Sequence, residues 1–465
     1  MVRPTADSLD SLGTRLPLRR QRPSARPTAA LAGPAASAAG GSLLMLAFML
    51  SLAVPGTFGA GPVNLTLYRV VLLGACIPLG LRWISGRAGP VTAVDLLFLA
   101  SCLWISIALV AVHGLSRVVF IGTNFVELFG GYLMGRVLVR DAAGYRHFIQ
   151  CLMLLLLGLF PFLLAEFLTG ARLLNTVFGL LFSTPEVLPH TRLGFTRAVG
   201  PFPHPIHLGL IASVAFANVY FVLWRRREVV RLVPACFVFA TTMLAISSGP
   251  LFSLVLQTGM MLWERILAFL RSRWILAILI GGGGFAVLLV SVQGGLFTYV
   301  VENLVFSTGA GEHRLDIYRY GTRAVLQNPW FGVGLGEWAR PFWREHPTID
   351  SFWLMTAVRH GIPGILLLLI GLLVGMVRIA TARGLDEDAG HYRSGYLIAL
   401  CGLLLILSTV HIWGTVNVFV MAYFGAGAWF YARAAVPAPP PVRGRAVVRE
   451  PAPERRRPRG AGPGR

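Results

Sequence analysis

Long, uninterrupted runs of apolar residues dominate the chain from about residue 42 to residue 433. Each run holds roughly 20 residues, which is the helix length that crosses ~30 Å of hydrocarbon. The runs are continuous and do not alternate with polar positions, so a transmembrane β-barrel is excluded. The pattern predicts about twelve membrane-spanning helices, at residues 42–56, 63–81, 92–112, 117–137, 147–168, 206–224, 231–247, 250–267, 274–293, 351–377, 395–412 and 415–433.

The composition agrees with a chain that lies mostly in lipid. Hydrophobic residues make up 55% of its 465 positions and charged residues only 13%, whereas soluble domains carry about 25% charge. We therefore expect an all-α fold, a polytopic helical membrane protein of about twelve transmembrane helices with a large extracytoplasmic loop.

The net charge of +21 is concentrated at the two ends of the chain. Residues 1–42 hold six arginines, and residues 433–465 hold nine. Both segments are rich in Pro, Ala and Gly, which predicts two disordered, basic cytoplasmic tails, residues 1–41 and 435–465, around a membrane domain at 42–434. Such tails hold topology and contact anionic membrane lipids, so we do not expect nucleic acid as a partner.

The remaining arginines alternate between loops in a way that predicts orientation. With the N-terminus inside, the inner loops carry most of the arginines, while the short outer turns carry Arg117 alone. The excess of positive charge on inner loops follows the positive-inside rule. Both termini are then cytoplasmic, and the two long polar loops, residues 169–205 and 294–350, are extracytoplasmic.

These two outer loops carry arginine against the usual bias, and an external cluster of guanidinium groups suits an anionic ligand, most simply a phosphate. The arginines are Arg172, Arg192, Arg197, Arg314, Arg319, Arg323, Arg340 and Arg344.

The second loop contains an expected amphipathic helix at 312–328 that lies on the membrane surface. Arg319 and Arg323 share one face of it; the opposite face carries Leu315, Tyr318, Thr322 and Val325. The basic face is either an anchor for lipid headgroups or a cradle for pyrophosphate. The glycines of GVGLG (332–336) that follow form either a phosphate-binding turn or a tight re-entry turn.

Four side chains are candidates for acid–base chemistry. Asp350 at the start of the tenth span either caps that helix, the ordinary role of an acid there, or acts as a general base. His346 is a second candidate base. His204 and His207 are either interfacial anchors or ligands, and no third metal ligand lies at a suitable spacing. We expect neither a metal nor a cofactor.

Arg69, Glu127 and Glu166 are charged residues in the predicted spans 63–81, 117–137 and 147–168, and all three fall towards the outer leaflet. Each costs roughly 2.5–3.5 kcal/mol in mid-membrane if it has no partner. A buried Arg69–Glu127 pair explains two of them, and a hydrophilic cavity open to the outer loops explains all three.

Several segments resemble the O-antigen ligase and polysaccharide polymerase (Wzy-like) superfamily of bacterial inner membranes, over residues 40–435. The resemblance is strongest in EHRLDIYRYGTRAVLQNPWFGVGLGEW (312–338) and DSFWLMTAVRHGIPG (350–364), and is supported by FVELFGGYLMGRVLVRD (125–141), AEFLTGARL (165–173) and FPHPIHLG (202–209).

This resemblance implies an inverting glycosyltransferase that polymerises or ligates glycans carried on undecaprenyl pyrophosphate. The acceptor, a glycan or a lipid, attacks on the extracytoplasmic face of the plasma membrane, and lipid pyrophosphate leaves. Arg314 matches the family's arginine at the start of the loop helix, and Asp350 is the expected base. The other contacts to phosphate or sugar would come from Arg319, Arg323, Arg197, Arg192 and Arg340.

Two departures from the family favour a polymerase over a ligase. The ligases have histidine and asparagine where this chain has Asp350 and Ser351, and they carry an arginine where it reads SSGP (247–250). Arg192 or Arg197 is a candidate replacement for that arginine.

Two other functions stand as alternatives. One is a multi-span transporter or flippase of an anionic or lipid-linked substrate, and the other is a non-catalytic scaffold that assembles with other polysaccharide-assembly proteins.

Overall fold

The computed structural model describes residues 34–60, 63–184, 189–223, 228–270, 272–281, 308–341 and 348–432. It forms two compact units, residues 1–41 and 42–465. Only residues 34–41 of the first unit are described, and they are the helical start of α1. The predicted tails otherwise lie outside the described residues, as does the end of the predicted span 274–293 beyond residue 281.

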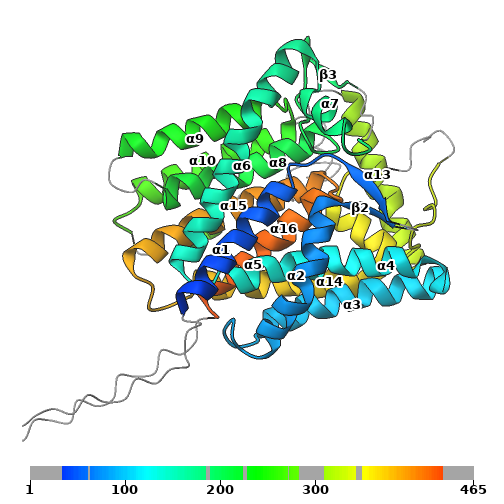
Figure 1. The fold of residues 1–465 in the computed structure, drawn as a ribbon, viewed down its shortest axis with the longest axis horizontal. Coiled ribbons are helices and arrows are strands. Elements are labelled where there is room, and N and C mark those ends of the chain that lie inside the picture. The colour runs from blue at the N-terminus through cyan, green and yellow to red at the C-terminus, as the bar shows by residue number, and fades with distance from the viewer. Residues whose placement is uncertain are drawn as a thin grey trace, which may run out of the picture. The chain divides into compact units, whose positions relative to one another are not determined.

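The second unit is built almost entirely of helices (Figure 1). They are α1 (Pro34–Ser51, begun in the first unit), α2 (Leu67–Ile84), α3 (Ala93–His113), α4 (Val118–Phe125), α5 (Gly131–Leu138), α6 (Ala142–Thr169), α7 (Leu173–Gly179), α8 (Pro205–Val222), α9 (Glu228–Met243), α10 (Ser248–Ile266), α13 (Thr308–Gln327), α14 (Phe352–Ala380), α15 (Glu387–Thr409) and α16 (Thr415–Ala426).

Shorter elements complete the fold. A π-helical turn, Val126–Gly130, joins α4 to α5. Two small antiparallel hairpins pair β1 (Thr57–Ala60) with β2 (Val63–Thr66) and β3 (Thr191–Arg192) with β4 (Phe195–Thr196). The all-helical expectation is therefore correct for the membrane helices and misses only these short hairpins.

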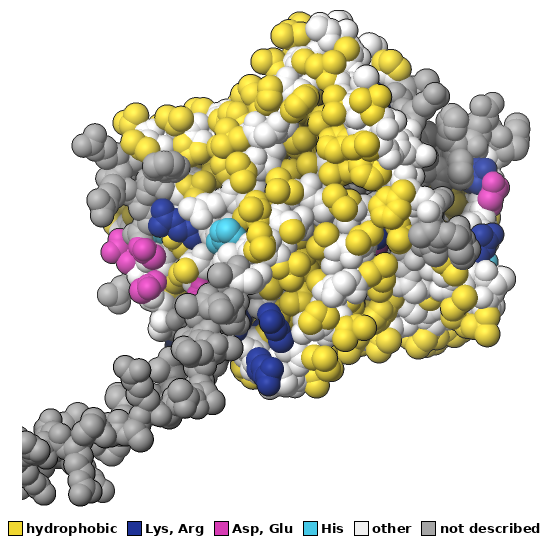
Figure 2. All heavy atoms as spheres, in the orientation of Figure 1, with side chains coloured by type: hydrophobic (Ala, Val, Ile, Leu, Met, Phe, Trp, Pro, Cys, Tyr) yellow, Lys and Arg dark blue, Asp and Glu magenta, His cyan; other side chains and the backbone are white. Residues whose placement is uncertain are grey.

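Six helical segments of the described chain are long and apolar enough to cross a membrane. They are Leu67–Ile84, Ala93–Leu138, Ala142–Thr169, Pro205–Val222, Phe352–Ala380 and Glu387–Thr409. Figure 2 shows apolar side chains spread over the outside of these helices, and Ile77, Ile107 and Leu373 are each more than half exposed. A surface of this kind indicates a lipid-facing bundle. The full set of twelve spans stays a prediction.

The helices pack so that the predicted inner loops, with their arginines, lie together at one end of the bundle. We call this the arginine-rich end. α14 runs antiparallel to α3, because Gly364 packs against Trp104 and Gly375 against Val94. In the same way α15 runs antiparallel to α8 and α10. The helix ends near Arg82 and Arg393 and the connection that carries Arg140 therefore share one end. The opposite end, which we call the cavity end, carries residues 169–184, 189–204, 330–341, 348–351 and 410–414.

Two glycines of α5 let its backbone touch that of α16. A Cβ atom on Gly135 would overlap the carbonyl oxygen of Ala422, and one on Gly131 would lie 3.0 Å from that of Val418. On α16, Gly425 faces the Tyr132 carbonyl with the same lack of space. Glycines spaced by four residues allow close packing of membrane helices.

Arg136 and Asp95 form a buried ion pair at the arginine-rich end. Their side chains are 2% and 0% exposed, and Nε of Arg136 lies 2.8 Å from Oδ1 of Asp95. Arg136 also donates to the carbonyls of Ala88 and Pro90, and Tyr132 donates its hydroxyl to Asp95 at 2.6 Å. A buried charge is tolerated when its partners satisfy it this fully.

Candidate functional site

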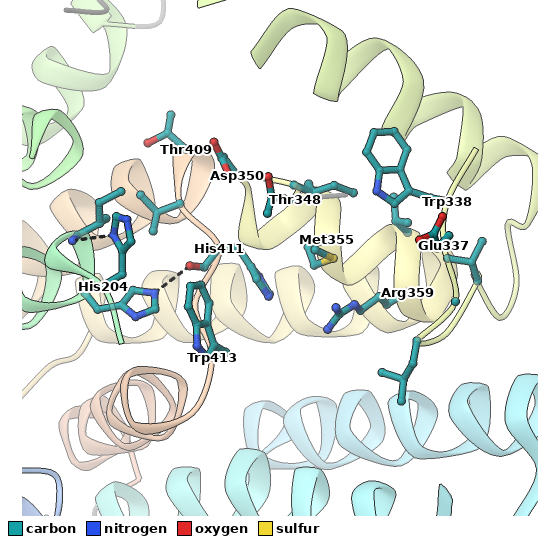
Figure 3. A pocket seen from close by; sticks show the side chains of 18 residues that line it. His204, Glu337, Trp338, Thr348, Asp350, Met355, Arg359, Thr409, His411 and Trp413 are labelled. Carbon is teal, nitrogen blue, oxygen red and sulfur yellow. Dashed lines mark hydrogen bonds between the residues drawn. The ribbon is translucent and has the colours of Figure 1, made fainter. Parts of the chain in front are cut away.

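A cavity of about 720 Å³ opens at the cavity end of the bundle. Its wall comes from the start of α8, the loop at 333–338, the segment 348–350, the first turns of α14 and the connection from α15 to α16 (Figure 3). Its polar and aromatic lining residues are His204, His207, Glu337, Trp338, Thr348, Asp350, Arg359, Thr409, His411 and Trp413. We call it the main cavity.

A break in α14 shapes the wall of this cavity. Gly361 has φ +75° and ψ 177°, so the helix is interrupted after two turns. The carbonyls freed at the break find donors: Val358 accepts from the N–H of Val333, and Arg359 from that of Gly334. The His360 carbonyl accepts from the indole of Trp104 at 3.1 Å. The break thus fixes the first turns of α14 against the glycine-rich loop.

The same bonds assign a role to the glycines of GVGLG. Every backbone N–H from residue 332 to residue 336 has an acceptor inside the protein, since Leu335 donates to Nε2 of His113 and the others donate to carbonyls. Gly332 and Gly334 have φ of +69° and +62°, which glycine adopts without strain. The loop is therefore a tight turn held against the break in α14, and the use of its N–H groups within the protein argues against the phosphate-binding interpretation.

Asp350 lines the main cavity and does not cap α14. The cap is Ser351, whose hydroxyl accepts from the N–H of Leu354, so the capping role predicted for Asp350 was wrong. Among the residues that the structure describes, no hydrogen bond or ion pair involves the Asp350 carboxylate. The carboxylate is half-buried on the cavity wall, where it can accept a proton or bind a donor group.

Arg359 is a cavity residue that the sequence reasoning missed. Met355 and Arg359 are four residues apart on one face of α14, and both line the cavity (Figure 3). Within the described part of the chain, the guanidinium of Arg359 has no acidic partner and no hydrogen bond. An arginine inside an apolar run was the available signal, the same one that drew attention to Arg69.

A second cavity of about 310 Å³ lies beside the first and shares Met355, Arg359, His411 and Trp413 with it. It contains the predicted Arg69–Glu127 pair, with Nε of Arg69 2.7 Å from Oε1 of Glu127.

The predicted pair is confirmed, and a partly polar cavity borders it. One cavity that explains all three embedded charges is not what the structure shows. Tyr68 also donates its hydroxyl to Glu127 at 2.9 Å. Glu166, the third embedded charge, lies in neither cavity lining. It pairs with Arg172 at 3.1 Å and accepts from the N–H of Gly200.

His204 and His207 lie on the cavity wall in a row of histidines. Ring centroids are 4.8 Å apart for His190 and His204 and 6.3 Å for His204 and His207. Nδ1 of His204 accepts from the N–H of Ile206, which caps α8. Nε2–H of His207 donates to the carbonyl of His411 at 3.0 Å.

Burial, with the nearby His190, Arg197 and His207, lowers the pKa of His204 to about 3. Burial also lowers the pKa of His411 to about 3. Both rings are therefore neutral near pH 7. No group of three or more His, Cys, Asp or Glu residues arranged to hold a metal ion occurs in the described parts of the chain.

The predicted arginines divide between several places. Arg319 and Arg323 on α13 are exposed, and neither lines the main cavity, whereas Ile317 and Ala324 form the buried face of that helix. Arg340 lies 3.2 Å from Glu337, an exposed residue of the cavity rim.

Arg192 and Arg197 reach the turn between α9 and α10. This is the region where the ligases carry an arginine and this chain does not. Arg197 donates to the carbonyl of Ala245 at 2.9 Å, and Arg192 to that of Ile246 at 3.3 Å. Burial, with the neighbouring Arg192, lowers the pKa of Arg197 to about 10. The side chain of Arg314 and the whole of His346 lie outside the described residues.

Comparison with known proteins adds no family assignment: no protein-family model matches the chain, and no curated protein matches it.

Proposed function

We propose that this protein is a membrane glycosyltransferase that extends a glycan carried on undecaprenyl pyrophosphate, as a polymerase more than as a ligase. One observation carries the proposal. The main cavity is lined by a carboxylate and a guanidinium, Asp350 and Arg359, and each has no partner among the described side chains. A base and a cation that line one cavity suit a reaction in which a hydroxyl loses a proton and an anionic substrate is held.

In the proposed reaction, Asp350 takes the proton of an acceptor hydroxyl. The hydroxyl oxygen attacks the anomeric carbon of the donor sugar from the side opposite the leaving group. The new C–O bond forms as the bond to pyrophosphate breaks, so the configuration inverts and lipid pyrophosphate leaves with the electron pair. The free energy comes from the pyrophosphate linkage.

The pyrophosphate needs fixed positive charge where it departs. By the family resemblance that role falls to Arg314, on the helix that packs against α14 at the cavity end. The buried side of α13 helps to form a small apolar cluster with Trp338, Ile349 and Met355, all of which line the main cavity. A side chain near the start of α13 is thus carried by a helix that is fixed to the cavity wall.

The reaction belongs on the extracytoplasmic face under this proposal. The arginine-rich end of the bundle would face the cytoplasm, and the main cavity would open outward, as the positive-inside rule favours. A reporter fused into the segment 308–341 reads this directly, because alkaline phosphatase is active outside the cytoplasm only. Activity of a cytoplasm-only reporter at that position would rule the proposal out.

The chemical test is Asp350→Asn in a strain that lacks the native gene. The amide is a poor base, so we expect loss of high-molecular-weight glycan on a gel, at unchanged protein level in the membrane. Asp386→Asn is the matched control, because Asp386 caps α15 at the other end of the bundle and asparagine caps equally well. Full-length polymer made by Asp350→Asn contradicts the assignment of the base.

A further inference from the structure

The charges around the main cavity suit a substrate group with a single negative charge. Its lining includes three charged side chains: the guanidinium of Arg359 and the carboxylates of Asp350 and Glu337. Glu337 is matched by Arg340, with Nη2 of Arg340 3.2 Å from Oε2 of Glu337. Among the lining residues that the structure describes, one guanidinium and one carboxylate then remain. A pyrophosphate brings more charge than one arginine neutralises, and it would also face Asp350.

Arg359 is half-buried and lines both cavities, so an anion that enters the main cavity can pair with it. The residue lies two turns into α14, roughly 10 Å from the helix start at 1.5 Å per residue. The preceding residue, Val358, is buried, and so is Met355, which lies one turn earlier on the same face of the helix. A guanidinium in such surroundings is costly unless an anion pairs with it. Its planar fork matches carboxylate and phosphate with two parallel hydrogen bonds. Of these two groups, the carboxylate brings a single negative charge.

The other walls of the main cavity fit a sugar ring. Trp413, which is 46% exposed, presents an accessible aromatic ring there, whereas Trp338 also lines the cavity but is buried at 5% exposure. Broad aromatic faces bind the apolar side of a ring, while histidine and threonine side chains nearby offer hydrogen bonds. The volume of about 720 Å³ holds more than one monosaccharide.

We propose that Arg359 binds the carboxylate of an acidic sugar, so that the glycan handled at this site contains uronic acid or a similar monoanionic residue. The inference rests on the proposed function and deepens it, because it names the class of sugar. Arg359 determines specificity, while Asp350 remains the base and the pyrophosphate is held by other cations.

The test measures binding to the full-length protein in lipid nanodiscs by calorimetry or ligand-observed NMR. Three probes are used: a disaccharide that ends in glucuronic acid, the same disaccharide ending in glucose, and inorganic pyrophosphate. We expect the wild-type protein to bind the acidic disaccharide at least roughly ten-fold more tightly than the neutral one, since a charge-assisted bidentate pair forms only with the acid. Equal affinities in the wild type overturn the proposal without any variant.

Arg359→Gln should abolish the preference and leave the weak affinity for the neutral disaccharide unchanged. Arg359→Lys should restore only part of it, because lysine lacks the planar fork. The control is Arg117→Gln, an exposed arginine at the same end of the bundle that lines neither cavity, and it should keep the full preference. If Arg359→Gln removes binding of pyrophosphate and spares the acidic preference, Arg359 is a phosphate contact and the proposal fails.

Asp350→Asn separates this inference from the proposed function. The variant should still prefer the acidic disaccharide while it makes no polymer. Polymer formation by Asp350→Asn contradicts the catalytic assignment alone. A wild-type protein that makes polymer but binds the acidic and neutral disaccharides equally contradicts the inference alone.

Discussion

Asp95→Asn should be among the most destabilising single changes in this chain. The two carboxylate oxygens of Asp95 accept from Arg136 at 2.8 and 3.2 Å, from Tyr132 at 2.6 Å and from the N–H of Thr92 at 2.8 Å. An asparagine keeps one of these acceptors and replaces the other with an N–H donor.

The cost follows from the groups that lose their partner. The new amide N–H₂ faces Thr92 N and Arg136 Nη2, so at least two donors lose an acceptor, at about 1–3 kcal/mol each. Arg136 is also left as an unpaired buried cation, and breaking a buried ion pair in this way costs about 3–5 kcal/mol. The two estimates describe the same event, so we expect a loss of about 3–5 kcal/mol in total.

Heating in detergent followed by fluorescence-detected size exclusion measures this effect as an apparent midpoint. Asp141→Asn is the matched control, because Asp141 is an exposed cap of α6 at the same end of the bundle, and asparagine caps as well as aspartate. The midpoint of Asp95→Asn should fall by several degrees while that of Asp141→Asn stays near the wild type. Equal midpoints for the two variants would refute the reasoning.

Two further changes test the cavity end. Gly361→Ala should destabilise the protein by about 2 kcal/mol or more, because φ is +75° there and a Cβ atom would overlap the Trp330 carbonyl. The control Gly74→Ala has open space around its Cβ position and should be neutral or slightly stabilising. Similar thermal midpoints for the two variants would contradict this. The folded pKa of His204, about 3, lies below the usual 6.5, so its contribution to stability is complete above about pH 6.5 and is lost as the pH falls towards 3. His204→Asn should flatten this acid limb of the midpoint against pH, and an unchanged limb would count against the assignment.

The embedded charges show what hydropathy alone predicts well. An arginine and a glutamate in neighbouring apolar runs need each other, and Arg69 and Glu127 do pair. The same rule also predicts a polar or charged partner for Arg136 and Arg359, two residues in apolar runs for which none was predicted above. Hydropathy predicts that such a residue needs a partner, but only the packing of helices shows that Arg136 has Asp95 whereas Arg359 faces a cavity.

The sequence does not predict which residue caps α14 or how the N–H groups of the glycine-rich turn are used. Asp350 and Ser351 are both good caps, and the choice of Ser351 depends on one residue of register. The glycine-rich turn has the composition of a phosphate loop. Two of its N–H groups, those of Val333 and Gly334, instead donate to carbonyls at the helix break 25 residues away. Nothing local to the turn signals that long-range pairing.

The backbone contact between α5 and α16 constrains the order in which the protein can be completed. Residues 131–135 leave the ribosome almost three hundred residues before Ala422 and Gly425, which they touch. Until then, the narrow groove at Gly131 and Gly135 has only lipid or a temporary neighbour against it. The last helix therefore closes the bundle, and chains truncated before residue 415 should be inserted yet remain open to quality-control proteases.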